Sequence, residues 1–193
     1  MVSLHAPVRV VILQHPSEQK HPLATVPILK ACLSNLEVHV GSVFPESLLS
    51  HLDLARCRVL FPNDNATIWD TSTEGASLSV DAASTDAECD ALIVLDGTWR
   101  KAKRMWFENP WLHAIPAVMI KAQESSHYRI RSSSVKGGLS TLETVTQACN
   151  YLSSSHSFDA LMNPFEAMID MQIKKMGIEV FNAHYSSFDD EVD

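Results

Sequence analysis

One acidic residue follows the most apolar run of this 193-residue sequence and is well placed to do chemistry. Ala91–Leu95 is apolar throughout, and Asp96 comes directly after it. A buried strand that ends there would put a carboxylate at the rim of a sheet, where ligands of α/β folds bind. The alternative is that Asp96 only caps the following helix, and spacing alone leaves both roles open.

The three residues after Asp96 have structural explanations of their own. Gly97 permits tight backbone geometry, and the hydroxyl of Thr98 can cap a helix that begins beside it. Trp99 can pack with Trp106 between that helix and the sheet, or it can line a ligand site. The sequence leaves the role of Trp99 undecided.

A second motif, Ser140-Thr141-Leu142-Glu143, matches the S-x-x-E capping box. In this box the serine hydroxyl and the glutamate carboxylate each bind a backbone N–H group at the start of a helix. The same helix start also presents N–H groups that can bind a carboxylate or the edge of a nucleotide. The two roles are compatible.

Metal and other cofactor motifs are missing from the sequence. None of the nine histidines has metal-ligand spacing, and the four cysteines form no C-x-x-C pair, so we predict no metal site and reduced, mostly buried thiols. The sequence contains no G-x-x-x-x-G-K-[ST], G-x-G-x-x-G or G-x-S-x-G. This argues against nucleotide hydrolysis, dinucleotide binding and serine hydrolase chemistry.

Charge is unevenly distributed along the chain. The net charge is −8, which argues at first against a nucleic-acid partner. Eight basic and three acidic residues lie between Asp96 and Lys136, so this window carries +5 and the remainder −13. The window can attract nucleic acid locally, although a solvated helix face is the simpler interpretation of a basic run.

The order of elements predicts an α/β fold. Strands are expected at 8–13, 36–40, 58–61, 91–95, 117–121 and 127–131, and helices at 23–33, 47–55, 98–108, 139–151 and 164–176. Residues 63–90 are polar and predict a surface excursion. Alternating strands and helices favour a largely parallel sheet with helices on both faces.

Ligands of such folds bind beyond the carboxyl ends of the strands. We therefore expect the loops His15–Glu18, Phe61–Asn65 and Asp96–Trp99 to converge, joined by Gly137–Ser140. His15 and Glu18 are weak signals when taken by themselves.

Length and composition predict one domain, from residue 1 to 185, followed by an acidic, disordered tail at 186–193. The sequence has no stretch of about 18 apolar residues and no signal-peptide pattern, so we expect a soluble, cytoplasmic protein without a membrane partner. The oligomeric state is left open.

Taken in order, several segments resemble the DTW-domain family, which includes tRNA-uridine aminocarboxypropyltransferases and is related to SPOUT methyltransferases. The similarity extends from about Val8 to Tyr151. It rests on Leu13-Gln14-His15-Pro16 with Glu18, Leu60-Phe61-Pro62, Leu95-Asp96-Gly97-Thr98-Trp99 with Ala102, Tyr128-Arg129-Ile130-Arg131, and Leu139-Ser140-Thr141-Leu142-Glu143.

The resemblance implies a C-terminal trefoil knot that shapes an S-adenosylmethionine pocket. It also implies transfer of the 3-amino-3-carboxypropyl group from S-adenosylmethionine to N3 of a uridine in tRNA, with release of methylthioadenosine. Many relatives carry an N-terminal cysteine cluster typical of zinc, but no cysteine precedes Val8 here.

On this basis we assign Asp96 as the general base. Backbone and side chains expected at the cofactor belong to Phe61, Pro62, Leu95, Gly97, Thr98, Trp99, Leu139, Ser140 and Thr141. Contacts to RNA are expected from His15, Glu18, Arg100, Lys101, Arg104, Arg129 and Arg131.

Two other functions remain open at this point. A SPOUT-type RNA methyltransferase could use the same pocket with the cofactor turned to present its methyl group. A non-catalytic RNA-binding module would bind tRNA without any dependence on the cofactor.

Overall fold

The computed structural model describes residues 3–70, 89–121, 138–153, 155–177 and 181. These residues form a six-stranded sheet in the order β2-β1-β5-β3-β6-β4, and every strand pair is parallel. The strands are β1 (Arg9–Gln14), β2 (Leu36–Val40), β3 (Cys57–Leu60), β4 (Thr67–Trp69), β5 (Ala91–Asp96) and β6 (Ala117–Ile120).

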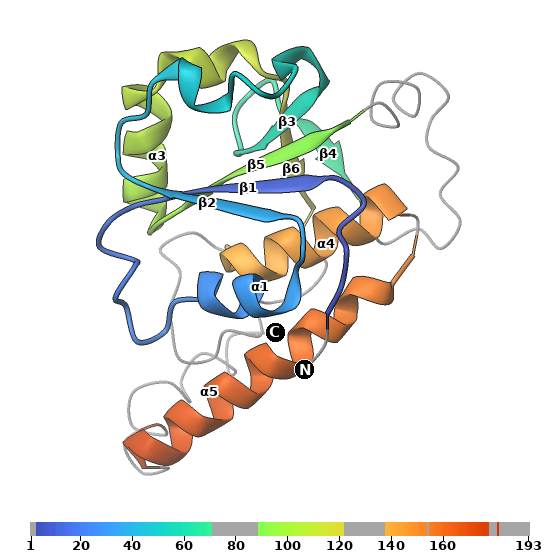
Figure 1. Cartoon of the computed structure of the whole chain (residues 1–193). Helices are drawn as coiled ribbons and strands as arrows, with labels where there is room; N and C mark the ends of the chain where they lie inside the picture. Colours follow the sequence, from blue (N-terminus) through green and yellow to red (C-terminus); the bar gives the residue numbers. More distant parts are fainter. Residues whose placement is uncertain (1–2, 71–88, 122–137, 154, 178–180, 182–193) are drawn as a thin grey trace, which may run out of the picture.

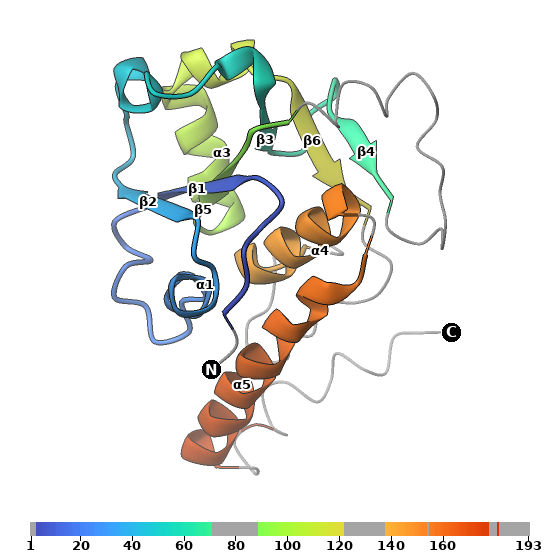
Figure 2. The ribbon, with the colours of Figure 1, turned by 45° about the vertical axis from the view of Figure 1, so that its right-hand side comes forward.

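Helices connect the strands and cover both faces of the sheet (Figures 1 and 2). The α-helices are α1 (Val26–Cys32), α3 (Trp99–Glu108), α4 (Thr141–Ser153) and α5 (Met162–Met176). Short 3-10 helices are η1 (Glu46–Leu49), η2 (Leu54–Arg56), η3 (Pro110–Ala114) and η4 (Ser157–Leu161). The predicted α/β class, with a parallel sheet and helices on both faces, is confirmed.

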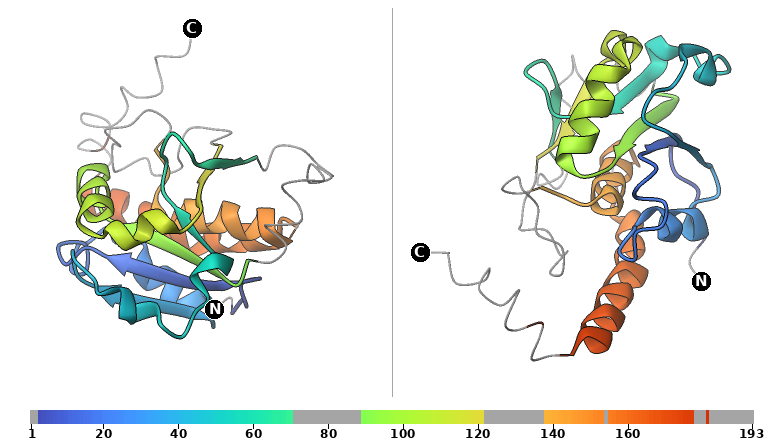
Figure 3. Two further views of the ribbon diagram at one scale, coloured as in Figure 1. Left: turned by 90° about the horizontal axis from the view of Figure 1, so that it is seen from above. Right: turned by 90° about the vertical axis from the view of Figure 1, so that its left-hand side faces the viewer.

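Strand β1 shows how the sheet separates two hydrophobic cores. Val10 and Ile12 face one cluster, which includes residues of α1, α4 and α5, while Val11 and Leu13 face the other, which includes α3 and η3. Alternate side chains of a strand point to opposite faces, so both faces of β1 must be apolar. Helix α5 runs diagonally away from the sheet beyond this first cluster (Figure 3).

Two predicted segments differ from the structure. Residues 47–55, predicted as one helix, form η1 and η2 instead, because the Asp53 carboxylate accepts the N–H of Ala55 and starts a new turn. The predicted surface excursion at 63–90 is wrong for β4, where Trp69 is fully buried and stacks on Tyr151 at 4.7 Å between ring centroids.

Other predictions lie outside the described residues. They concern the strand at 127–131 and the tail at 186–193. The trefoil knot depends on the path of the chain through 122–137, which is also outside the described residues, so the knot stays a prediction.

The chain leaves β1 and β5 toward opposite faces of the sheet. β1 leads to α1 on one face, and its neighbour β5 leads to α3 on the other. Where connections from adjacent parallel strands diverge in this way, the loops leave a crevice beyond the carboxyl ends of the strands. The topology therefore directs attention to Gln14 and Asp96, the last residues of these two strands.

Candidate active site at the ends of β1 and β5

Asp96 ends the central strand β5, and only 7% of its surface is exposed. Its Cα partner on β1 is Gln14, whose side-chain Nε2 donates to Oδ2 of Asp96 at 2.9 Å. The backbone N–H of His15 donates to the carbonyl of Asp96 at 2.8 Å. This bond extends the pairing of β1 with β5 by one hydrogen bond. β1 thus holds both the backbone and the carboxylate of Asp96.

Helix α4 supplies a further partner of this carboxylate. The hydroxyl of Thr141, the first residue of α4, donates to Oδ1 of Asp96 at 2.6 Å. Three segments that are distant in sequence therefore meet at one carboxylate. Two hydrogen bonds from separate elements fix its orientation, as expected of a group that must be aligned with a substrate.

The predicted capping box at the start of α4 is confirmed. The backbone N–H of Ser140 donates to the Glu143 carboxylate at 2.7 Å, and the N–H of Glu143 donates to the Ser140 hydroxyl at 3.3 Å. Glu143 is 3% exposed, so these bonds are shielded from water. The box fixes the first turn of α4 and with it the position of Thr141.

Gln14 is part of the site, although the sequence did not single it out as a site residue. It is a polar residue directly after the apolar run Val10–Leu13, the same signal that identified Asp96 after Ala91–Leu95. Its meaning depends on the register of β1 and β5, which the sequence does not give.

The turn after Asp96 owes its glycine to close packing. A Cβ at Gly97 would lie 3.1 Å from Cβ of Lys101 and 3.4 Å from the backbone nitrogen of Ala102, closer than most side chains tolerate. Thr98 is the N-cap residue of α3, and its carbonyl accepts from Ala102 N–H, but its hydroxyl makes no capping bond. The hydroxyl cap predicted for Thr98 is wrong, since this exposed helix start leaves its first N–H groups to solvent.

A second polar cluster lies beside Asp96 and joins α3 to the loop after β1. Lys101 Nζ donates to Oε1 of Glu18 at 3.0 Å and to the hydroxyl of Ser17 at 2.5 Å. The side chain of Glu18 is 4% exposed and that of Lys101 30%. Both were predicted to contact RNA, and in the structure they bind each other.

His15 is held by the same loop. Its Nδ1 accepts the backbone N–H of Ser17 at 3.2 Å and lies 2.9 Å from the Ser17 hydroxyl. A nitrogen that accepts a hydrogen bond carries no proton in neutral imidazole, so the proton of the neutral ring is on Nε2. The loop thereby fixes one tautomer of His15 next to the turn that contains Gly97.

The remaining residues predicted at the cofactor are distributed around this junction. Phe61 stacks on Trp106 of α3, with 4.7 Å between ring centroids, so its ring belongs to the core and only its backbone can serve a ligand. Leu95 is 7% exposed and packs in the same core. Pro62 is exposed, while Leu139 and Trp99 are partly exposed.

Trp99 and Trp106 differ in what they contact. Trp106 packs in the cluster beneath α3, whereas Trp99 is partly exposed and belongs to neither described hydrophobic cluster. Core packing therefore accounts for Trp106 and does not account for Trp99.

Of the predicted RNA contacts, Arg100 and Arg104 are exposed on α3. Arg104 forms an ion pair with Glu108 one turn later, at 2.7 Å. Arg129 and Arg131 lie outside the described residues.

The cysteines are buried thiols and form no metal site among the described residues. Cys32, Cys57, Cys89 and Cys149 are free and buried, as predicted. Burial raises the pKa of Cys57 to about 11, with a further contribution from Cys89, and burial raises the pKa of Cys149 to about 12. Across the described ranges no group of three or more His, Cys, Asp or Glu residues could hold a metal ion.

Among the helices that the structure describes, none is long and apolar enough to cross a membrane.

Comparison with known proteins identifies similar chains. The DTW domain profile matches residues 1–173. The chain is 30% identical over 174 residues to tRNA-uridine aminocarboxypropyltransferase 2 of Macaca fascicularis, covering 89% of this chain and 57% of the relative. The Drosophila melanogaster protein of the same name is 30% identical over 174 residues, which is 89% of this chain and 67% of the relative.

A third relative, tRNA-uridine aminocarboxypropyltransferase 2 of Mus musculus, is 30% identical over 172 residues, covering 84% of this chain and 54% of the relative. The chain thus spans about half to two thirds of the length of these curated relatives. No solved structure matches it.

Proposed function

Because this chain belongs to the DTW-domain family, we propose that it transfers the 3-amino-3-carboxypropyl group of S-adenosylmethionine to N3 of a uridine in tRNA. The observation that carries the proposal is the similarity over most of the chain to proteins named tRNA-uridine aminocarboxypropyltransferase. Their name states the acceptor and the group that is moved, and S-adenosylmethionine is the donor that can supply this group.

Asp96 is the general base of the proposed reaction. Uridine N3 holds a proton at neutral pH and is a poor nucleophile until a base removes it. The Asp96 carboxylate is oriented by Gln14 and Thr141 and is largely shielded from water. A base held in one orientation in a site poor in water competes less with solvent for the proton of its substrate.

The bond changes balance without an oxidant or a metal. The N3 proton passes to a carboxylate oxygen of Asp96, and the lone pair left on N3 forms a bond to the γ-carbon of the aminocarboxypropyl group. The bond from that carbon to the sulfonium sulfur breaks, and its electrons stay on sulfur. Methylthioadenosine leaves as a neutral thioether, so the leaving group needs no acid.

The described residues suit a donor with a carboxylate and an adenosine. The N–H groups of Thr141 and Leu142 lie in the first turn of α4, where helical N–H groups have no acceptor within the helix and attract anions. Backbone of Phe61, Pro62, Leu95, Gly97, Ser140 and Leu139 surrounds the same strand ends. We assign the donor to this rim and the uridine to the side of His15, Trp99 and α3.

Two samples of S-adenosylmethionine, each labelled in a different group, test the proposal directly. Purified protein is incubated with unmodified tRNA and with S-adenosylmethionine labelled either in the methyl group or in the aminocarboxypropyl chain. We expect the second label alone in tRNA, as a uridine heavier by one aminocarboxypropyl group in nucleoside mass spectrometry. Methyl label in tRNA would identify a methyltransferase, and tRNA binding without either label would identify a binding module.

A further inference from the structure

Helix α3 has one buried side and one exposed side. Ala102, Met105 and Trp106 are buried against the sheet, and the exposed side consists of three cations and one aromatic ring. These residues are Arg100, Lys103, Arg104 and Phe107. Residues three and four apart are neighbours on a helix, so Arg100, Lys103 and Phe107 form one continuous stripe.

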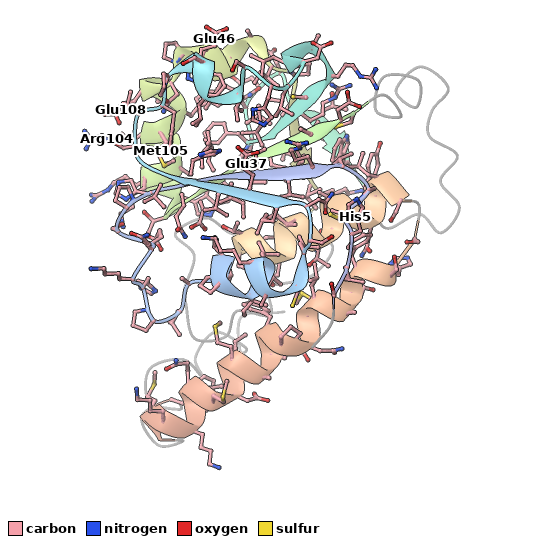
Figure 4. The ribbon with its side chains drawn as sticks, viewed as in Figure 1. His5, Glu37, Glu46, Arg104, Met105 and Glu108 are labelled. Atoms are coloured by element: carbon pink, nitrogen blue, oxygen red, sulfur yellow. The ribbon has the colours of Figure 1, made fainter. Side chains whose placement is uncertain are left out.

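The cations of α3 differ in what they bind. Lys101 is paired with Glu18, and Arg104 with Glu108. Arg100 and Lys103, by contrast, have no hydrogen bond or ion pair to any residue that the structure describes. Figure 4 shows Arg104 beside Glu108 on the outer side of α3, with Met105 turned inward. The positive charge available to a partner therefore lies on Arg100 and Lys103.

Phe107 is the unusual member of the stripe. Its surface is 64% exposed, although the ring gains nothing from water, and the core beneath α3 is already filled by Trp106 and Met105. An exposed ring at the end of this row of cations has no role in packing the helix. A ring that is left in solvent can bind the face of another planar group.

The end of α3 that carries Phe107 is held rigidly. Asn109 is fully buried, and its side chain accepts the N–H of Phe44 and donates to the carbonyls of Ser42 and Met105. The bonds to Phe44 and Ser42 fix the helix end to the loop after β2, and the bond to Met105 closes the last turn of the helix. Binding of a partner to Phe107 would therefore not lose conformational entropy by ordering a flexible segment.

We propose that Arg100, Lys103 and Phe107 form a binding stripe for unpaired RNA, with the two cations on phosphates and a base stacked on the phenyl ring. Cations alternating with exposed aromatic rings are the chemistry by which proteins bind single-stranded nucleic acid. Because the overall charge of the chain is −8, RNA is repelled by its acidic parts and has to be bound at a local group of cations such as this one.

The stripe rests on the proposed function, because it defines how the tRNA would approach Asp96. Arg100 lies in the first turn of α3, next to the turn after Asp96, and Phe107 lies seven residues further, about 10 Å along the helix axis. The base that stacks on Phe107 therefore lies a few nucleotides away from the modified uridine. The stripe selects uridines that sit in unpaired loops.

The role of the Phe107 ring is tested by RNA binding. The affinities for tRNA and for an unstructured RNA oligonucleotide are measured without S-adenosylmethionine. Phe107→Ala should weaken both affinities by about 5- to 150-fold, the range for loss of one stacked base. Phe107→Leu should lose nearly as much, and Phe107→Trp should retain binding. Met171→Ala on α5 is the control, because Met171 is also an exposed apolar residue, at 65%.

The cations are tested by salt dependence. Arg100→Ala/Lys103→Ala should lower the slope of log affinity against log salt by about 1.4 for single strands, since each phosphate contact contributes about 0.7. Lys174→Ala/Lys175→Ala removes the same charge from the exposed end of α5 and should leave the slope unchanged.

The outcomes separate this inference from the proposed function. Loss of RNA binding in the stripe variants, in a protein that transfers neither label, would support the stripe and refute the transferase. If the wild type transfers the label but Phe107→Ala and Arg100→Ala/Lys103→Ala bind RNA normally, the binding stripe is wrong. The proposed transferase function would be unaffected by that result. Equal losses in the α5 controls would also overturn it, because they would show an unspecific charge or surface effect.

Discussion

Helices α3 and α4 begin at the same edge of the sheet but lie on opposite faces and differ in what they expose. Seven of the 13 residues of α4 are buried, and its first residue binds Asp96. Only three of the 10 residues of α3 are buried, and its outer side is basic. We infer that the two helices have different roles: α4 orients the carboxylate that is the proposed base, and α3 binds a large, charged partner.

The largest expected effect comes from Asp96, which lies between the two helices. Asp96→Asn keeps the shape of the side chain but cannot act as the proposed base, because an amide does not take up a proton at neutral pH. Turnover should fall by roughly 10²- to 10⁴-fold, as for loss of a general base, while tRNA affinity stays near that of the wild type. Single-turnover kinetics and binding assays measure the two quantities. Near-normal turnover would move the chemistry away from the end of β5.

The next effect compares Lys101, a paired cation of α3, with Arg100 and Lys103 on the same helix. Lys101→Met keeps the aliphatic stem but removes the ammonium from the buried Glu18 carboxylate. The free energy of unfolding should fall by about 1–3 kcal/mol, less than for a fully buried pair because Lys101 is partly exposed. Urea titration measures the loss. A drop in the salt slope of RNA binding, without loss of stability, would instead make Lys101 a phosphate contact.

A smaller effect is expected at the first residue of α4. Thr141→Val removes the hydroxyl that donates to Asp96 while keeping the shape of the side chain. Turnover should fall about tenfold, the equivalent of about 1.4 kcal/mol for one hydrogen bond to a charged group, with tRNA affinity unchanged. Thr141→Ser retains the hydroxyl and is the matched control. Equal turnover in both variants would show that α4 does not position the carboxylate.

The smallest expected effect concerns Cys149 of α4, whose burial is tested by the pH dependence of stability. The pKa of Cys149 is raised from 9.0 to about 12 by burial, so the folded protein keeps the thiol protonated where the unfolded chain loses its proton. The contribution of this thiol to stability is complete below pH 9 and declines as pH rises from 9 toward 12. At pH 9.5 the loss should be about 1 kcal/mol.

Comparison with Cys149→Ala isolates this contribution. The variant should be less stable at every pH because it leaves a small cavity, but its stability should decline less between pH 8 and pH 9.5. Parallel curves in denaturant titrations of the two proteins would mean that the thiol is accessible to solvent.

The sequence predicted best where one local pattern determines the result. Ala91–Leu95 is apolar on both faces of a strand, and it became the central strand of the sheet. The capping box at Ser140 and Glu143 involves residues three apart, so its hydrogen bonds could be predicted from spacing alone. The assignment of Asp96 to a strand end needed only the residues around it.

The sequence failed where the outcome depends on distant partners. Gln14 was missed because its role comes from register with Asp96. Folding also brings Lys101 and Glu18, 83 positions apart, into an ion pair that the sequence did not predict, while their contact with RNA stays a prediction. Trp69 lies in a polar segment, and its burial comes from pairing of β4 with β6 and stacking on Tyr151. No local pattern carries such information.

The hydrogen bonds of Asp96 also have a consequence for how the chain folds. They join it to Gln14, 82 positions away, and to Thr141, 45 positions away. Contacts of such long sequence separation form slowly, because the loops between them must close first. Both bonds to the carboxylate should therefore appear only when β1, β5 and α4 have all docked. During refolding, the proposed transferase activity would return last, after helical signals have already recovered.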